Sequence, residues 1–276
     1  MTVAEAKNDN KLDLFAVRSL LFLPASNPRA IAKAREAGAD LVILDLEDAV
    51  KVEDKAAARR AAVEAVAASW PTPVAIRING VGTQWHSVDL DAAARSKADF
   101  VVVPRASSSH LIRDIAATVD KPVLAMIETA AGVLAAAQIA AETAGLIAGT
   151  NDLRADLCLP LDSGREPISA SLQLIVLAAR AAHVAVFDGV FNNLEDSEGF
   201  RSEADEGRRL GFDGKSLIHP NQISPCHEAF APTDAEIERA RGLVEAFQGG
   251  AERFGNEMIE RMHVEAAERV LERAAN

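Results

Sequence analysis

Short apolar runs recur along the chain, and each is followed by a longer segment rich in alanine and charged residues. Continuous apolar runs are typical of parallel strands that are covered on both faces, and the segments between them provide the helical crossovers that such strands need. Eight runs predict an α/β fold, a closed (β/α)8 barrel of the TIM type. They are Ser19–Leu23, Leu41–Leu44, Val74–Ile78, Phe100–Val103, Val123–Ile127, Leu146–Ala148, Val184–Phe187 and Gly214–Ile218.

The segments between the runs carry helix signals. Asn27-Pro28 places a proline at a first helical position, and residues 56–68 form an alanine-dense stretch. No linker or shift in composition divides the repeated units. Residues 18–232 are therefore predicted as one barrel domain, preceded by an N-terminal extension, 1–17.

The C-terminal part follows a different pattern. Residues 233–248 and 256–275 read as helices outside the barrel, separated by the Gly249-Gly250 pair. A glycine pair at this place can act as a hinge. Residues 233–276 are therefore predicted as C-terminal helices that form a lid or a subunit contact.

The composition is that of an ordinary soluble protein with an excess of acidic residues. Of 276 residues, 49% are hydrophobic, and 29 Lys and Arg face 41 Asp and Glu, for a formal net charge of −12. This balance repels a nucleic-acid backbone or an anionic membrane over most of the surface. Neither is predicted as a partner, and an anionic substrate would need a local cluster of basic side chains.

The two cysteines, Cys158 and Cys226, fit neither a zinc spacing nor a CxxC motif. They predict a reducing compartment and two small buried side chains rather than a disulfide framework. Residues 1–11 are polar and lack an apolar leader segment, and no apolar run approaches the length of a membrane span. A cytoplasmic location is the expectation.

Polar side chains gather where the predicted strands end. In a barrel these strand ends converge on one mouth, so the whole set predicts a site there. Any single member is equally explained as a charged residue that begins a loop. The set consists of Asp45, Glu47, Asp48, Arg77, Asn79, Arg105, Glu128, Asn151, Asp152, Asp188, Lys215 and His219.

Glu128 and Asp152 end neighbouring strands, so their carboxylates can reach one point. Two close carboxylates are unfavourable unless a cation lies between them. Magnesium suits a pair of carboxylates because it keeps waters and leaves positions for an oxygen substrate, whereas zinc prefers His or Cys ligands. From the residues alone, a metal pair and two ordinary loop-starting charges both remain open.

Basic residues at the predicted mouth have two readings each. Arg77 can hold a carboxylate or stabilise an enolate oxygen, or it can form a buried ion pair with the acidic cluster around Asp45. Arg29 and Lys33 share one face of a helix start and can meet the phosphates of a large anionic cofactor, or they can be solvated. No GxGxxG fingerprint, P-loop or Ser-His-Asp order is present, so a nicotinamide cofactor has no support.

Seven sequence motifs follow one another over nearly the whole chain: Arg18–Pro24, Leu44–Val50, Arg77–Asn79, Ile127–Gly132, Gly149–Leu153, Asp188–Val190 and Gly211–Ile223. Read together, these motifs make the chain similar to the citrate lyase β-subunit-like (CitE-like) CoA-ester lyases of the HpcH/HpaI aldolase superfamily. The resemblance implies a TIM-type barrel, Mg2+ and the making or breaking of a carbon–carbon bond between an acyl-CoA and an α-keto acid.

The resemblance also implies roles for single residues. Glu128 and Asp152 match the family's magnesium ligands, and Arg77 matches its substrate-binding and catalytic arginine. Further positions that match substrate or CoA contacts are Phe22, Arg29, Lys33, Glu128, Asp188 and Gly189. Glu260, in Met258-Ile259-Glu260, stands where the family carries a catalytic aspartate, and it is one methylene longer.

Three hypotheses for the function follow. The first is a stand-alone magnesium-dependent lyase or synthase that acts on a citryl-, malyl- or citramalyl-type CoA thioester. The second is the β-subunit of a citrate lyase complex that acts on an acyl-carrier-protein thioester. The third is a barrel that works without CoA, either as a metal-dependent aldolase or as a non-catalytic binding protein. The resemblance further implies a homo-oligomer, a trimer or a hexamer.

Overall fold

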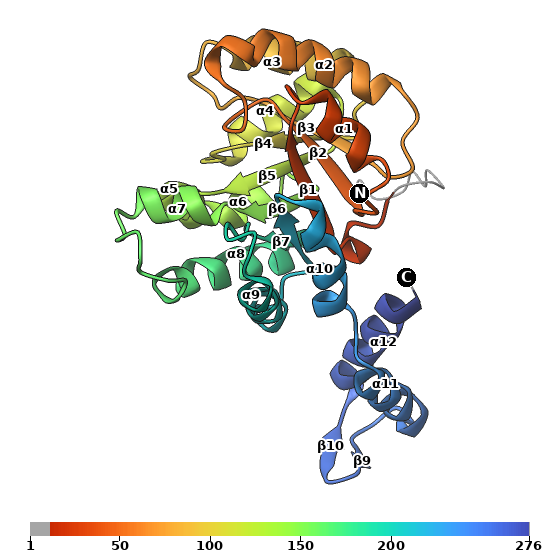
Figure 1. Ribbon diagram of the computed structural model, residues 1–276. Helices are drawn as coiled ribbons and strands as arrows, with labels where there is room; N and C mark the ends of the chain where they lie inside the picture. Colours follow the sequence, from red (N-terminus) through yellow and green to blue (C-terminus); the bar gives the residue numbers. More distant parts are fainter. Residues whose placement is uncertain (1–11, 276) are drawn as a thin grey trace. The chain divides into compact units, whose positions relative to one another are not determined.

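The computed structural model describes residues 12–275, and its centre is a closed barrel of parallel strands paired in chain order, with β8 closing on β1 (Figure 1). This confirms the predicted barrel, and every predicted apolar run overlaps a strand. β2 to β8 are buried at every residue, as parallel strands covered on both faces must be. The strands are β1 (Ser19–Pro24), β2 (Leu41–Asp45), β3 (Val74–Arg77), β4 (Phe100–Val103), β5 (Val123–Ile127), β6 (Gly145–Ala148), β7 (Ala185–Asp188) and β8 (Gly214–Leu217).

A single buried cluster includes side chains from most of the strands, among them Leu41, Leu124 and Phe187. Leu14 and Val17, near the short helical turn η1 (Leu14–Ala16), belong to the same cluster. The described part of the predicted N-terminal extension therefore contributes to the core of the barrel. Residues 1–11 of that extension lie outside the described residues.

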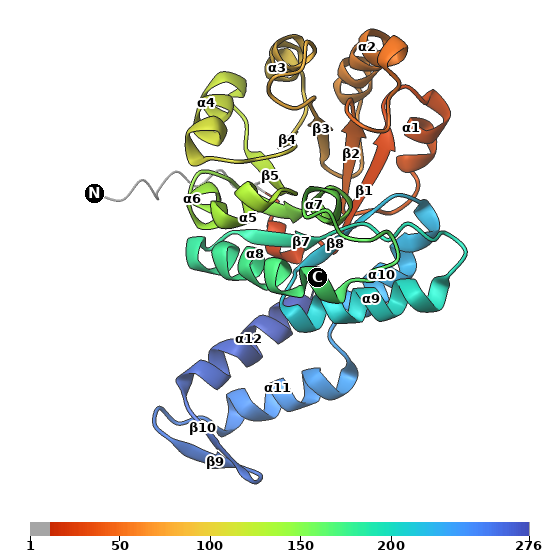
Figure 2. The ribbon, with the colours of Figure 1, turned by 90° about the vertical axis from the view of Figure 1, so that its left-hand side faces the viewer.

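Helices surround the barrel on the outside of the strands (Figure 2). The first one starts as the sequence predicts, because the Asn27 side chain accepts a hydrogen bond from the N–H of Ala30 and Pro28 occupies the first turn. The helices of the barrel part are α1 (Pro28–Ala34), α2 (Lys55–Ala67), α3 (His86–Arg95), α4 (Ser109–Val119), α5 (Ala130–Leu134), α6 (Ala136–Ala140), α7 (Thr150–Asp156), α8 (Ser169–Ala182), α9 (Ser197–Leu210) and α10 (Ile223–Phe230), with short turns η2 (Val52–Asp54), η3 (Glu166–Ile168) and η4 (Pro220–Gln222).

The chain divides into two compact units, the first ending at Cys226 and the second beginning at His227. The division falls inside α10, a few residues before the predicted boundary at 232/233. In the second unit, α11 (Asp234–Ala246) and α12 (Arg261–Ala275) pack around a small buried cluster that includes Leu243 and Ile259. Two helices are therefore present, as predicted for this segment.

The predicted helix over 256–275 is wrong at its start. Residues 252–259 form an antiparallel hairpin of β9 (Glu252–Phe254) and β10 (Glu257–Ile259), in which Phe254 pairs with Glu257. Gly255 supports the tight turn with a φ of 60°, a backbone conformation that side chains other than glycine rarely adopt. The helix begins only at Arg261.

Both cysteines are free thiols. Cys226 is buried, as predicted, and burial raises the pKa of its thiol to about 12. The prediction was wrong for Cys158, which is exposed in the turn after α7. Among residues 12–275, no helix combines the length and the apolar character that a membrane crossing needs.

Candidate active site

The carboxyl ends of the barrel strands enclose a cavity of about 400 Å3. Its lining comes from strand ends and the loops that follow them, where active sites of this fold lie. The structure therefore brings many of the polar strand-end residues to one place. The lining includes Phe22, Asp45, Asp48, Arg77, Glu128, Asn151 and Asp152.

Glu128 follows β5 and is only 2% exposed. Its Oε1 accepts a hydrogen bond of 2.6 Å from the backbone N–H of Arg105. A Cβ atom on Gly149 would lie 2.4 Å from Glu128, so only a glycine leaves room for this side chain. Burial and, to a smaller extent, the charge of Asp152 raise the pKa of Glu128 to about 7, against the lowering effect of the Arg105 hydrogen bond.

Asp152 lies in the first turn of α7, where the helix dipole favours an anion. Its Oδ1 is 3.6 Å from a terminal guanidinium nitrogen of Arg105. Burial and the nearby charge of Asp48 raise the pKa of Asp152 in spite of Arg105. Arg105 therefore serves both carboxylates, one through its backbone and one through its side chain, from a left-handed conformation with a φ of 49°.

The chemistry of this donor set fits magnesium. The charge of Asp152 raises the pKa of Glu128, and burial and the charge of Asp48 raise the pKa of Asp152, so negative charge gathers here without full compensation. Within residues 12–275, no group of three or more His, Cys, Asp or Glu side chains is arranged to hold a metal ion. Glu128 and Asp152 alone would leave most positions around a Mg2+ ion to water or to substrate oxygens, as magnesium sites commonly do.

Arg77, at the end of β3, forms a buried bidentate ion pair with Asp45. Its Nε lies 2.6 Å from Asp45 Oδ1 and its Nη2 lies 2.7 Å from Asp45 Oδ2. The remaining terminal nitrogen is 3.0 Å from Glu47 Oε2, and the guanidinium carbon is 5.3 Å from the centre of the Phe22 ring. Arg77 therefore forms a buried ion pair with the acidic cluster around Asp45 and also lines the cavity.

The charges around Arg77 are strongly coupled. Burial works against the charge of Arg77, but Asp45 and then Glu47 outweigh it and raise its pKa. Burial raises the pKa of Glu47 to about 8, against the lowering effect of Arg77. At neutral pH the charge of Arg77 is therefore matched mainly by Asp45.

Lys55 organises the loop between β2 and α2, a role that the sequence did not reveal. Its ammonium group donates to the carbonyls of Leu46 and Glu47, at 2.8 and 2.7 Å, and to Asn79 Oδ1 at 2.7 Å. On the other side, Asp45 accepts the backbone N–H groups of Glu47 and Ala49. The loop that carries Glu47 and Asp48 is thus held from both sides.

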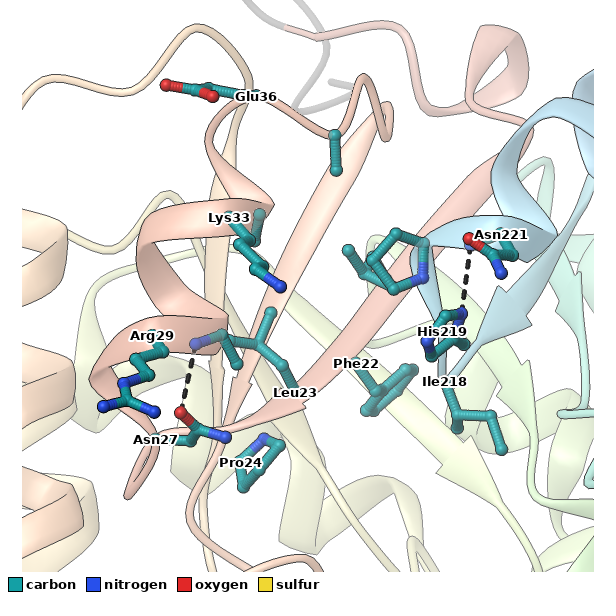
Figure 3. A pocket seen from close by; sticks show the side chains of 15 residues that line it. Phe22, Leu23, Pro24, Asn27, Arg29, Lys33, Glu36, Ile218, His219 and Asn221 are labelled. Carbon is teal, nitrogen blue, oxygen red and sulfur yellow. Dashed lines mark hydrogen bonds between the residues drawn. The ribbon is translucent and has the colours of Figure 1, made fainter. Parts of the chain in front are cut away.

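A second cavity, of about 540 Å3, shares Phe22, Leu23, Pro24 and Ile218 with the first (Figure 3). Arg29 and Lys33 line it from α1, and Lys33 points into it whereas Glu36 points away (Figure 3). His219 lines the opposite side, where its ring accepts a hydrogen bond from the N–H of Asn221. The structure therefore places these two cations beside the mouth of the barrel.

Asp188 and Gly189 occupy a different environment from the one expected. Asp188 is fully buried, and its carboxylate contacts Arg165 at 2.7 Å and Lys215 at 3.0 Å. Burial works against its charge, but these two cations lower its pKa. A Cβ atom on Gly189 would lie 2.4 Å from Thr150. These ion pairs link the end of β7 to Lys215 in β8 and to Arg165. They give no support to a substrate contact through the Asp188 side chain.

Glu260 belongs to the second unit and is exposed between β10 and α12. Its backbone N–H donates to the ring of His263 at 3.0 Å, and its carbonyl accepts the N–H of His263. These backbone contacts fix where α12 begins.

Sequence comparisons decide the family. The pattern of the HpcH/HpaI aldolase/citrate lyase family matches residues 18–220, and that of the carbon–carbon bond lyases of the TIM-barrel fold matches residues 165–276. The chain belongs to the HpcH/HpaI aldolase/citrate lyase family. The first of these two matches includes the motifs that carry Arg77, Glu128 and Asp152.

Relatives within this family align over most of their length. The chain is 41% identical to a (3S)-malyl-CoA thioesterase of Cereibacter sphaeroides (strain KD131), over 93% of this chain and 94% of the relative. It is 31% identical to the citrate lyase subunit beta of Escherichia coli (strain K12), over 93% of each. A crystal structure of CitE from Mycobacterium tuberculosis with magnesium, acetoacetate and coenzyme A is 34% identical, with a TM-score of 0.85 over 95% of this chain and 100% of that one.

Proposed function

We propose that the protein is a magnesium-dependent lyase or synthase that acts on a CoA thioester of a malyl, citramalyl or citryl type. The observation that carries the proposal is the pair Glu128 and Asp152, two poorly compensated carboxylates in one cavity with Arg77. Family membership and the similarity to CitE bound to magnesium and coenzyme A support it.

The chain's residues suit the cleavage of such a thioester. Glu128 and Asp152 would hold the metal ion, which supplies a positive charge that polarises the oxygens of the α-hydroxy or α-keto acid. In cleavage, the hydroxyl loses its proton, the bond to the carbon next to the thioester breaks, and that carbon later gains a proton. Arg77 lines the same cavity and would stabilise negative oxygen during these steps.

The second cavity suits the CoA part of the substrate. Arg29 and Lys33 make no ion pair with any carboxylate of residues 12–275, so their charges are available for phosphate groups. Phe22 lines both cavities and joins the proposed phosphate end to the reacting end.

Proton transfer is the step for which we propose Glu260. Glu260 is exposed in the second unit, directly after the hairpin of β9 and β10. Replacing Glu260 by Gln would lower kcat and leave Mg2+ binding unchanged if this role is correct. A chain ended after Gly249 that kept full activity would contradict it.

Hydrolysis of the thioester is a second candidate, favoured by the 41% identity to a (3S)-malyl-CoA thioesterase. Here water adds to the thioester carbonyl and the carbon–sulfur bond breaks. An acyl-carrier-protein thioester is the alternative carrier, supported by the similarity to citrate lyase β-subunits. The carrier and the bond that breaks can be tested together.

The deciding experiment incubates the protein with (3S)-malyl-CoA, with Mg2+ or a chelator, and analyses the products by mass spectrometry. Acetyl-CoA and glyoxylate would support carbon–carbon cleavage, whereas malate and free CoA would support hydrolysis. Citramalyl- and citryl-CoA, and the same acyl groups on an acyl-carrier protein, identify the substrate and carrier. Absence of any turnover, with or without Mg2+, would overturn the proposal.

We also propose that the protein is a homo-oligomer, a trimer or a hexamer. Leu174 and Leu177 lie one helical turn apart on α8 and are 47% and 58% exposed, so this helix carries an apolar outer edge. Light scattering coupled to size-exclusion chromatography would give the mass directly. A monomer at micromolar concentration would contradict this part of the proposal.

A further inference from the structure

A third cavity, of about 500 Å3, borders the active-site cavity and has no part in the function proposed above. It lies between the loop after β6, α7 and the loop after β7. The two cavities share four lining residues, Thr150, Asn151, Val190 and Asn192. Whatever separates the cavities must therefore be built from these residues.

Asn151 and Asn192 form that separation. The side-chain amide of Asn151 donates to Asn192 Oδ1 at 3.2 Å, and that of Asn192 donates to Asn151 Oδ1 at 2.8 Å. The reciprocal pair links the first turn of α7 to the loop after β7. Both residues are exposed, so water competes for their hydrogen bonds and each bond contributes little to stability. The pair can therefore open at small cost.

The walls of the third cavity suit a flexible chain with an anionic end. Leu159, Ile168 and Phe191 supply apolar surface. Arg165 is already neutralised, because three carboxylates surround its guanidinium, those of Asp188, Glu203 and Glu206 at 2.7, 3.4 and 3.3 Å.

Arg154 differs from Arg165 in its partners. Its guanidinium donates to two neutral oxygens, the carbonyl of Gly164 and the hydroxyl of Ser163. No carboxylate within residues 12–275 forms an ion pair with it. Arg154 lines the third cavity and therefore offers a positive charge there.

We propose that the Asn151–Asn192 pair is a partition that limits the length of the α-keto acid accepted by the enzyme. The cavity behind it is a subsite for the side chain of longer α-keto acids, and Arg154 is the partner for a carboxylate at the far end of that chain. This inference rests on the proposed function, because the metal pair Glu128 and Asp152 would hold the other end of the same acid.

The test measures the binding of three acids by calorimetry in the presence of Mg2+. Glyoxylate is the short acid, 2-oxoglutarate has a distal carboxylate, and 2-oxopentanoate has the same chain length without one. Replacing Asn192 by Ala should improve the affinity for 2-oxoglutarate relative to glyoxylate by about tenfold or more, which corresponds to about 1.4 kcal/mol. An unchanged ratio would overturn the inference.

Two further variants complete the design. In the Asn192→Ala background, Arg154→Met should remove the gain for 2-oxoglutarate and keep that for 2-oxopentanoate. Gln173→Ala is a matched control, because it removes an amide hydrogen bond, to the carbonyl of Leu210, away from the three cavities. A similar shift in Gln173→Ala, or the same loss for both long acids in Arg154→Met, would contradict the assignment.

Turnover measurements distinguish a failure of the proposed subsite from a failure of the proposed function. With acetyl-CoA, wild type should condense glyoxylate, and Asn192→Ala should gain 2-oxoglutarate as a substrate. If no acid is turned over but the affinity ratio still shifts, the subsite is correct and the proposed function fails. If glyoxylate is turned over and the ratio does not shift, the proposed function stands and the subsite fails.

Discussion

The two sides of the barrel mouth treat their charges in opposite ways. On the side of β2 and β3, Asp45, Arg77 and Lys55 are buried and their polar groups meet one another or the backbone. On the side of β5 and β6, the one hydrogen-bonding or ion-pair partner that Glu128 and Asp152 share among residues 12–275 is Arg105, whose guanidinium lies 3.6 Å from Asp152. The paired charges on the side of β2 and β3 can fix the conformation of the mouth. The side of β5 and β6, here called the unpaired side, keeps negative charge to which a cation can bind.

The largest expected effect is on activity, on the unpaired side. Glu128→Gln and Asp152→Asn should each lower kcat by at least about 100-fold, because the charge of a bound metal is worth several kcal/mol in the transition state. Product formation from the CoA ester measures this. Glu142→Gln is the control, because Glu142 pairs with Arg113 at the surface. Near-normal turnover in either site variant would remove the basis for the comparison.

On the paired side, the main effect should be on stability. Asp45→Asn leaves the buried Arg77 without its main charged partner and should lower the free energy of unfolding by about 3–5 kcal/mol. Denaturation in guanidinium chloride measures the change. A loss below about 1 kcal/mol would show that the ion pair is not what holds this side together.

Lys55→Met tests the paired side in a second way, because it removes the donor to the carbonyls of Leu46 and Glu47 and to the side chain of Asn79. We expect a loss of about 1–3 kcal/mol together with a raised KM for the keto acid, since the loop bearing Glu47 and Asp48 is released. Lys121→Met is the matched control, because Lys121 also donates to a carbonyl, that of Ala94, away from the mouth. Equal effects of the two variants on KM would contradict the positioning role.

The smallest effect concerns the backbone of Arg105. Its left-handed conformation directs the N–H toward Glu128, and glycine adopts this conformation without strain whereas alanine does not. Arg105→Gly should therefore be more stable than Arg105→Ala by about 1 kcal/mol, although both lose the same guanidinium. Thermal unfolding of the pair measures the difference, and the reverse order would mean that the conformation changes on substitution.

The sequence predicted the barrel closely because its evidence is physical and local. Strands covered on both faces must be apolar throughout, so runs such as Phe100–Val103 and Val123–Ile127 mark their strands residue for residue. The hairpin at 252–259 escaped prediction, because its strands are too short to show an alternating pattern. Its turn glycine, Gly255, is the only local signal.

The site was partly predictable for a similar reason. Strand ends converge in a barrel, so placing Glu128, Asp152 and Arg77 at strand ends was enough to bring them into one cavity. Lys55 could not be found this way, since in an alanine-rich helix it looks like any solvated lysine, and only the fold directs it to the carbonyls of Leu46 and Glu47. The left-handed backbone conformation at Arg105 could not be predicted either, because the position carries neither glycine nor asparagine, the residues that usually adopt it.

We predict that the charge of Glu128 destabilises the protein when no metal is bound. Burial raises its pKa from 4.5 to about 7. The native state therefore binds the proton more tightly than the unfolded state, and stability from this group rises as the pH falls through 7. Above pH 7 the buried charge should cost on the order of 3 kcal/mol, since each pKa unit is worth about 1.4 kcal/mol.

Denaturation of wild type and Glu128→Gln at pH 8, in chelator and in excess Mg2+, tests this most directly. In chelator, Glu128→Gln should be more stable than wild type, by up to about 3 kcal/mol, and the difference should shrink by pH 5.5. Excess Mg2+ should stabilise wild type and have little effect on the variant. If the variant is less stable than wild type in chelator, or is stabilised equally by Mg2+, the claim that Glu128 is a ligand of Mg2+ is contradicted.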